Sequence, residues 1–238
     1  MDRIGLYIHI PFCKAKCYYC DFNSYGGMEC LQDEYVNSVG DELEMRASLI
    51  RERGVKTVFI GGGTPTYLNL SALGKLLASV GKYISSPVEY TCEANPGTLS
   101  DEKLMMLKEY GVNRLSIGLQ SWDNDMLRYL GRIHTREEFL KNYYAARDIG
   151  FDNINIDLMF SVPGQSLEIW DDTLKNTISL KPRHISCYGL MIEDGTAFGR
   201  LHDAGKLNEV DDELDPEYTF TDLELKILEG LSQYFVEN

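Results

Sequence analysis

The chain has 238 residues, of which 44% are hydrophobic and 25% charged, values typical of a globular protein that builds its core without disulfides. Its net charge of −14 disfavours nucleic acid as a partner, because phosphate backbones would be repelled. No apolar run reaches the roughly 18 residues that span a bilayer, and the amino terminus lacks a signal-peptide pattern. We therefore expect a soluble, cytoplasmic protein without a membrane span.

Strand and helix signals alternate along the chain. Six segments rich in β-branched residues are predicted to be strands, at 6–11, 57–61, 89–94, 114–121, 153–160 and 184–191. Helical periodicity is found between them, at 33–53, 71–83, 101–110, 136–149 and 167–180. Capping residues at Ser71, Ser100 and Thr135 are predicted to start three of these helices. Such alternation predicts βα units and a parallel sheet.

The predicted strands have one apolar face and one small, polar face. Asn155 and Asp157, for example, alternate with Ile154, Ile156 and Leu158. A closed eight-stranded barrel fills its interior with bulky aliphatic side chains, and a doubly wound sheet has strands that are apolar on both faces. We therefore predict the α/β class, as an open partial (β/α)6 TIM-like barrel of parallel strands with outer helices around a polar lumen.

Three of the six cysteines follow the first predicted strand in C-x3-C-x2-C spacing, at Cys13, Cys17 and Cys20. In a cytosolic chain this spacing favours a metal site over disulfides. Zinc needs a fourth Cys or His, and none follows in this loop. Three thiolates suit a [4Fe–4S] cluster with one open iron. The other three cysteines have no partner spacing and are predicted to be small, buried apolar side chains.

Glycine and polar side chains follow the other predicted strands. Gly62 and Gly63 belong to a Gly-rich turn that lacks both the lysine of a P-loop and dinucleotide-fold spacing, so a plain tight turn remains an alternative. Glu93 and Gln120 end the third and fourth strands, and Asp157 lies within the fifth. A buried carboxylate such as Asp157 needs a partner, for which Arg132 is one candidate. Together these residues favour a site at the carboxyl ends of the strands.

Seven motifs in chain order resemble the radical S-adenosylmethionine (SAM) superfamily, and within it the oxygen-independent coproporphyrinogen III oxidase family and its heme-chaperone branch. They are YIHIPFC at 7–13, GGGTPT at 61–66, EANP at 93–96, SIGLQS at 116–121, LGRIH at 130–134, NIDL at 155–158 and PGQ at 163–165. The resemblance implies that Cys13, Cys17 and Cys20 bind a [4Fe–4S] cluster whose fourth iron binds SAM.

By the same resemblance, further residues would surround SAM. Tyr7, Gly62 and Glu93 would contact the SAM on the cluster. Tyr19 matches an aromatic residue that contacts SAM. The positions that match residues around SAM in the oxidase, including its second SAM molecule, are Gly63, Thr64, Gln120, Arg132 and Asp157.

The chain departs from the oxidase at two places. Phe22 replaces the oxidase's fourth cysteine, which favours the chaperone branch and puts decarboxylase activity and a second SAM in question. The relatives also continue into a carboxy-terminal domain, so we expect a radical SAM barrel at 1–200, followed at 201–238 by an acidic loop and the start of a truncated region. Before Pro163 the family's usual Gly-Leu is Ser161-Val162, which indicates a local change of turn.

The resemblance favours a heme chaperone that delivers heme to acceptor proteins and cleaves SAM reductively to a 5′-deoxyadenosyl radical. Its implied partners are SAM, heme or a porphyrinogen, a reducing electron donor such as flavodoxin or ferredoxin, and a heme-accepting protein. Three alternatives stay open: an oxygen-independent coproporphyrinogen III oxidase, a glycyl-radical-enzyme activase, and a non-catalytic zinc-binding or scaffold protein.

Overall fold

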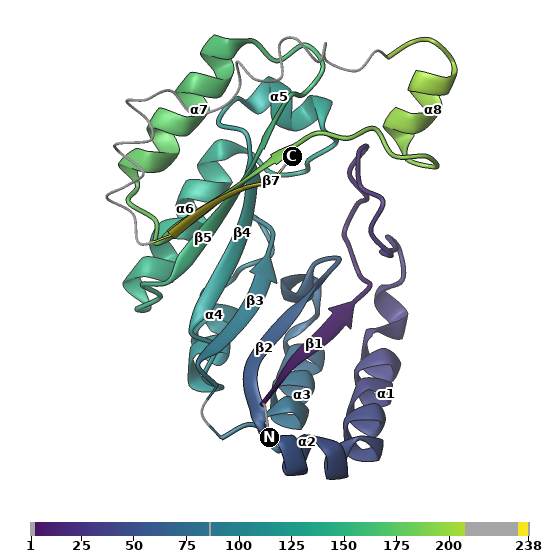
Figure 1. Cartoon of the computed structure of the whole chain (residues 1–238), viewed down its shortest axis with the longest axis vertical. Helices are drawn as coiled ribbons and strands as arrows, with labels where there is room; N and C mark the ends of the chain where they lie inside the picture. Colours follow the sequence, from purple (N-terminus) through teal and green to yellow (C-terminus); the bar gives the residue numbers. More distant parts are fainter. Residues whose placement is uncertain (1–2, 86, 208–232, 238) are drawn as a thin grey trace. The chain divides into compact units, whose positions relative to one another are not determined.

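The computed structural model describes residues 3–85, 87–207 and 233–237, and strands alternate with helices along the chain (Figure 1). The strands are β1 (Ile4–Ile10), β2 (Val55–Gly62), β3 (Glu89–Ala94), β4 (Arg114–Gln120), β5 (Ile154–Phe160), β6 (His184–Gly189) and β7 (Gln233–Glu237). The α-helices are α1 (Gln32–Met45), α2 (Ala47–Arg53), α3 (Leu70–Gly81), α4 (Asp101–Glu109), α5 (Asn124–Tyr129), α6 (Arg136–Asp148), α7 (Leu167–Ser179) and α8 (Ala197–Asp203). Two short 3-10 helices, η1 (Glu29–Leu31) and η2 (Pro65–Tyr67), precede α1 and α3.

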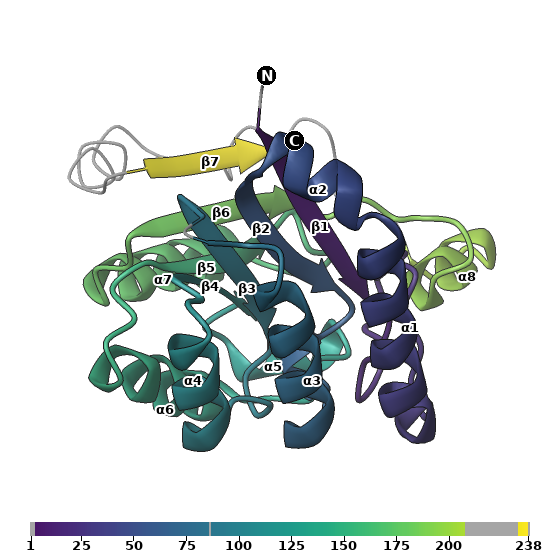
Figure 2. The same ribbon diagram turned by 90° about the horizontal axis from the view of Figure 1, so that it is seen from below.

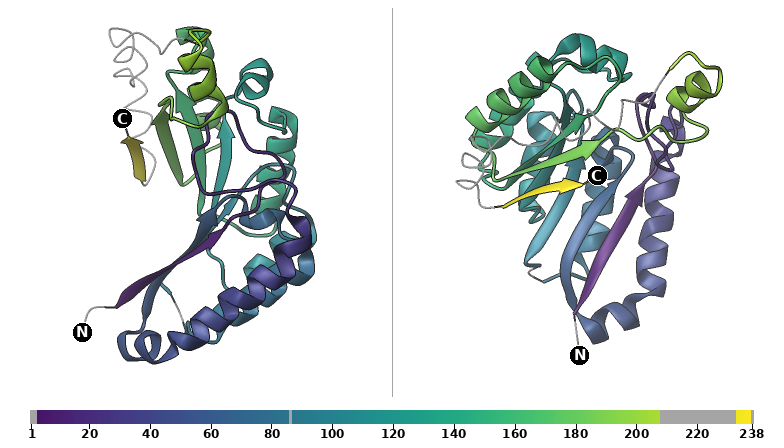
Figure 3. Two further views of the ribbon diagram at one scale, coloured as in Figure 1. Left: turned by 90° about the vertical axis from the view of Figure 1, so that its right-hand side faces the viewer. Right: turned by 45° about the horizontal axis from the view of Figure 1, so that its top comes forward.

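All six predicted strands are present, and the strands hydrogen-bond to one another in their chain order. The structure adds β7, which pairs in parallel with β6 from His184 opposite Gln233 to Tyr188 opposite Glu237. Figure 3 shows the two strands side by side. The predicted acidic loop lies outside the described residues.

The helices differ from the predictions in three places. The predicted helix at 33–53 is divided at Arg46, where a backbone φ of −93° and ψ of 0° separate α1 from α2. Ser71 does not cap α3, because the helix begins one residue earlier and the Asn69 side chain accepts from the backbone N–H of Ala72. The short helices α5 and α8 were not predicted.

Two predicted helix starts are confirmed by their hydrogen bonds. The Ser100 hydroxyl accepts from the backbone N–H of Lys103 at 3.3 Å. Thr135 and Glu138 form a reciprocal capping box: each backbone N–H donates to the other's side-chain oxygen, at 2.9 and 3.3 Å. Such caps satisfy backbone N–H groups that a helix leaves without partners.

The described chain divides into two compact units. The first contains Met1–Ala15, Phe22–Ser116 and Lys141–Phe151; the second contains Lys16–Asp21, Ile117–Leu140 and Asp152–Asn238. Among the described residues, no helix combines the length and apolar character needed to cross a membrane.

In the first unit, the parallel register brings the carboxyl ends of three strands together. Ile10 of β1 pairs with Gly62 of β2, and Ile60 of β2 pairs with Cys92 of β3. Figure 2 shows α1 and α3 on the same side of these strands. Fully buried aliphatic side chains such as Ile10 and Ile60 form the core, and burying each such side chain contributes about 1.5–3 kcal/mol. This packing fixes the strand ends where the predicted site residues lie.

In the second unit, β5 and β6 pair in parallel with Asn155 opposite His184 and Asp157 opposite Ser186. Helix α7 packs Trp170 against Phe160 of β5, with ring centroids 5.6 Å apart. A separate apolar cluster lies in the same unit and contacts the cysteine loop through Tyr19; its buried members are Leu130, Met159, Val162, Phe198 and Leu207.

Candidate functional site

Each glycine of the Gly-rich turn faces a different side chain at close range. A Cβ on Gly61 would lie 2.8 Å from the Glu93 carboxylate, and one on Gly62 would lie 2.5 Å from the His9 ring. A Cβ on Gly63 would lie 3.1 Å from the sulfur of Cys13. Gly62 also has a φ of +111°, a conformation that side chains rarely adopt. The turn is therefore glycine-rich because β1 and β3 approach it closely, which a plain tight turn would not require.

Glu93 and Tyr7 lie at the same strand ends. The backbone N–H of Gly62 donates to the Glu93 carboxylate at 3.0 Å. The pKa of Tyr7 is raised, chiefly by partial burial and further by the negative charge of Glu93. His9 donates its Nε2–H to the carbonyl of Asn23 at 2.8 Å, so its Nδ1 accepts from the Tyr7 hydroxyl at 3.0 Å. Tyr7, Gly62 and Glu93 thus lie together in the first unit.

Cys13 lies beside the same turn, in the first unit. Its sulfur is 3.5 Å from the Thr64 hydroxyl. The Cys13 backbone N–H donates to the carbonyl of Tyr25, and Tyr25 N–H donates back to Pro11. These bonds fix the start of the cysteine loop between β1 and the segment after it.

Cys17 and Cys20 belong to the second unit, where the turn after α5 holds their loop. Tyr18 N–H donates to the carbonyl of Leu130, and Phe198 N–H donates to the carbonyl of Tyr18. Gly131 follows with a φ of +74°, and a Cβ there would lie 2.8 Å from the Tyr18 ring. Glycine at 131 therefore permits the close contact between this turn and the cysteine loop.

Arg132 extends from this turn to the sulfur of Cys17. One guanidinium nitrogen donates to Cys17 Sγ at 3.5 Å and another to the carbonyl of Gly118 at 2.7 Å. Burial disfavours the charged form of Arg132 and so lowers its pKa, but the interactions with Tyr19 and Cys17 outweigh burial, and the pKa of Arg132 is raised overall. The pKa of Tyr19 is raised in turn, mainly by burial. A cation thus lies beside a sulfur that becomes negatively charged when it binds a metal.

His134, two residues after Arg132, is held neutral. It is 4% exposed and donates its Nε2–H to the carbonyl of Leu119 at 3.3 Å. Burial, together with the charge of Arg132, lowers its pKa from 6.5 to about 3. Arg132 is therefore the positive charge of this turn, and His134 secures the turn to the end of β4.

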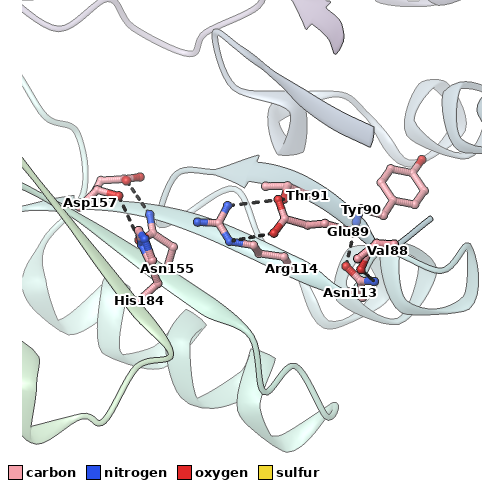
Figure 4. Close-up of polar contacts among 10 residues, drawn as sticks. Val88, Glu89, Tyr90, Thr91, Asn113, Arg114, Asn155, Asp157 and His184 are labelled. Carbon is pink, nitrogen blue, oxygen red and sulfur yellow. Dashed lines mark hydrogen bonds and ion pairs between the residues drawn. The ribbon is translucent and has the colours of Figure 1, made fainter. Parts of the chain in front are cut away.

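Gln120 and Asp157 complete the predicted set in the second unit. Gln120 is buried at the end of β4 with a φ of +72°, and such backbone strain is often found at functional sites. Asp157 accepts from the Asn155 amide at 2.7 Å, and Figure 4 shows these two side chains with His184. Sequence analysis did not identify Asn155 as a partner of Asp157, although the two-residue spacing on one strand face could have indicated it.

A second polar cluster in Figure 4 lies at the amino ends of β3 and β4, in the first unit. Arg114, at the start of β4, is 4.0 Å from the Glu89 carboxylate and donates to the Thr91 hydroxyl at 3.4 Å. Because it lies away from the carboxyl strand ends, we assign it a structural role.

All six cysteines are free of disulfides. The three predicted ligands are partly exposed, whereas Cys92 and Cys187 are buried, as predicted. Cys30 is exposed, so the prediction that it is a buried apolar side chain is wrong. It lies in η1, a 3-10 helix without buried residues. Within the described ranges, no three His, Cys, Asp or Glu side chains are gathered closely enough to hold a metal ion.

The model of the Radical SAM superfamily matches residues 7–176, which include all three cysteines of the C-x3-C-x2-C motif. The chain belongs to the radical SAM superfamily. Membership implies a [4Fe–4S] cluster and SAM as cofactors. The chemistry of these residues fits a cluster, because none of the three cysteines forms a disulfide. The sulfurs of Cys13 and Cys17 also each lie beside a side chain that can donate a hydrogen bond.

The chain is also similar to individual curated proteins. It is 40% identical over 98% of its length to "Heme chaperone HemW" of Bacillus subtilis, of which it covers 62%. It is 42% identical over 84% of its length to the HemW of Escherichia coli, of which it covers 53%. The chain therefore spans between half and two thirds of the length of these relatives.

Among solved structures, the chain is similar to the radical SAM enzyme coproporphyrinogen III oxidase (HemN) of Escherichia coli. The TM-score is 0.78 at 30% identity, covering 96% of this chain and 51% of that one. The likeness confirms the predicted fold class, the open partial TIM-like barrel of the radical SAM proteins.

Proposed function

We propose that this radical SAM protein is a heme chaperone, which binds heme and passes it to acceptor proteins. The observation that carries the proposal is the identity of 40% and 42% to two proteins named heme chaperone HemW, against 30% to the oxidase HemN. Phe22 supports it, because a 63% exposed phenylalanine stands where the oxidase family has a fourth cysteine.

The proposal assigns the cluster to Cys13, Cys17 and Cys20. When bound, a reduced [4Fe–4S] cluster supplies one electron for the sulfonium of SAM. In each unit, the chain's own residues lie beside a proposed ligand. Arg132 donates to the Cys17 sulfur, and the glycine turn approaches the Cys13 sulfur closely.

SAM is proposed to lie at the carboxyl strand ends. The Glu93 carboxylate, oriented by the Gly62 N–H, suits the positively charged amino group of SAM. Tyr7, beside Glu93, gives the same contact region an aromatic ring. In the second unit, Tyr19, Gln120, Arg132 and Asp157 are proposed to contact SAM, as are Gly63 and Thr64 in the first.

The direct test is heme titration of anaerobically reconstituted protein, followed at the Soret band. We expect heme to bind saturably. When a heme-free acceptor protein is then added and removed again on a resin, we expect the chaperone that remains to have lost its Soret band. An increase without saturation, equal to that of an unrelated acidic protein of similar size, would refute the chaperone proposal.

The second candidate is the oxidase, favoured by the structural likeness to HemN. Its test is anaerobic incubation with coproporphyrinogen III, SAM and a reductant such as reduced flavodoxin. We expect deoxyadenosine without vinyl product. Vinyl groups formed in proportion to deoxyadenosine would establish the oxidase instead.

A further inference from the structure

The Thr64 hydroxyl lies between an amide and the sulfur of Cys13. Its oxygen is 2.7 Å from Asn95 Nδ2 and 3.5 Å from Cys13 Sγ. An amide nitrogen donates but does not accept, so the Thr64 oxygen is the acceptor in the first contact. A cysteine that binds iron is a thiolate without a proton, so Thr64 must be the donor in the second. The hydrogen bonds then run in one direction, from Asn95 through Thr64 to Cys13.

The backbone around Thr64 fixes this geometry. Gly63 N–H donates to the carbonyl of Ile10 at 2.7 Å, and Thr64 N–H donates to the carbonyl of Phe12 at 2.8 Å. Thr64 is 2% exposed, so water does not compete freely for its hydroxyl.

The segment that carries Asn95 is tied to the same turn. The Thr98 hydroxyl donates to the carbonyl of Asn95 at 2.6 Å and lies 2.6 Å from the Thr66 hydroxyl. The ammonium of Lys103 donates to the carbonyls of Thr66 and Thr98, at 2.5 and 3.2 Å. Asn95 and Thr64 are therefore held in place independently of any bound cofactor.

We propose that Thr64 and Asn95 are positioning residues that set the reduction potential of the cluster through Cys13. The proposal rests on the proposed cluster ligands. Reduction adds negative charge to a cluster and its sulfurs, and a hydrogen-bond donor stabilises the more negative state. Thr64 therefore raises the potential, and Asn95 ensures that its proton points to the sulfur.

The first test compares three variants after anaerobic reconstitution, with iron and sulfide content measured for each. Thr64→Val removes the hydroxyl at nearly constant shape, and Thr64→Ser retains it. Thr66→Val is the matched control, because it removes a hydroxyl of the same turn that pairs with Thr98. Midpoint potentials are measured without SAM by redox titration followed by electron paramagnetic resonance.

We expect Thr64→Val to shift the potential to more negative values, and Thr64→Ser and Thr66→Val to leave it at that of the parent protein. An unshifted potential in fully loaded Thr64→Val would overturn the proposal, as would an equal shift in Thr66→Val. If the parent protein itself binds no cluster, the cluster assignment falls and this proposal falls with it. Failed heme binding would affect only the chaperone proposal.

The second test reverses the direction of the hydrogen bonds. In Asn95→Asp, the carboxylate only accepts, so it takes the Thr64 proton away from Cys13. We expect a more negative potential than in the parent protein. Part of this shift comes from the added negative charge. The same substitution in the Thr64→Val background measures the charge effect alone, because that background has no Thr64 proton to redirect. Equal shifts in the two backgrounds would overturn the role of Asn95.

Discussion

Replacing Gly63 with alanine tests whether the glycine turn is built around Cys13. The new Cβ would lie 2.8 Å from the carbonyl oxygen of Phe12, 2.9 Å from that of Ile10 and 3.1 Å from Cys13 Sγ. The two oxygens already accept from Thr64 N–H and Gly63 N–H, so they cannot move away without weakening those bonds. Overpacking of this kind costs about 1–3 kcal/mol, and a lost hydrogen bond adds about 1 kcal/mol.

We therefore expect Gly63→Ala to lower the free energy of unfolding by about 2–4 kcal/mol. Urea unfolding of the metal-free protein, followed by circular dichroism, should show a midpoint lower by roughly 1 M. Gly81→Ala is the control, because a Cβ at this exposed end of α3 meets nothing within 4 Å. A Gly63→Ala midpoint equal to that of Gly81→Ala would refute the reasoning.

Three further predictions address other parts of the chain. In the parent protein, the free energy of unfolding should fall as the pH falls from about 6.5 to 3, because the unfolded chain binds a proton that buried His134 does not. This costs up to about 1.4 kcal/mol per pH unit. His134→Gln should flatten this dependence, and an unchanged slope in urea midpoints measured against pH would contradict the prediction. Ser161→Gly should raise the free energy of unfolding by roughly 0.5–1 kcal/mol in urea titrations. Glycine relieves the strain of the left-handed backbone (φ +52°), and this gain exceeds the cost of the larger conformational entropy that glycine gives the unfolded chain. A loss of stability would contradict the view that Ser161 is strained. Cys17→Ala should abolish iron-dependent absorbance and SAM cleavage, whereas Cys30→Ala should retain both; lost absorbance in Cys30→Ala would mean that the ligands are wrongly assigned.

The strands were predictable because their signal is local. The alternation of apolar and polar residues, together with the strand–helix order, predicted β1 to β6, all of which the structure contains. Helix ends were less predictable, because Asn69 and Ser71 are both good capping residues and the sequence does not say which one adopts the extended backbone that a cap requires. Tertiary contacts decide such cases.

Parts of the site were predictable only as residue types. The family resemblance identified Gly63 and Thr64 as residues around SAM. It did not indicate that both lie beside the sulfur of Cys13. Asn95 was visible only as part of a motif, since its contact with Thr64 joins segments 31 residues apart. Ser161 adopts the left-handed backbone that glycine favours, a conformation that the sequence alone did not indicate.

The central claim is that three cysteines hold a cluster whose fourth iron is open to SAM. Its most direct test is iron and sulfide quantification on anaerobically reconstituted protein, with the electron paramagnetic resonance spectrum of the reduced protein recorded before and after SAM is added. We predict about four iron and four sulfide per chain and a spectrum that SAM changes. Zinc without iron, or a reduced cluster whose spectrum SAM leaves unaltered, would contradict the claim.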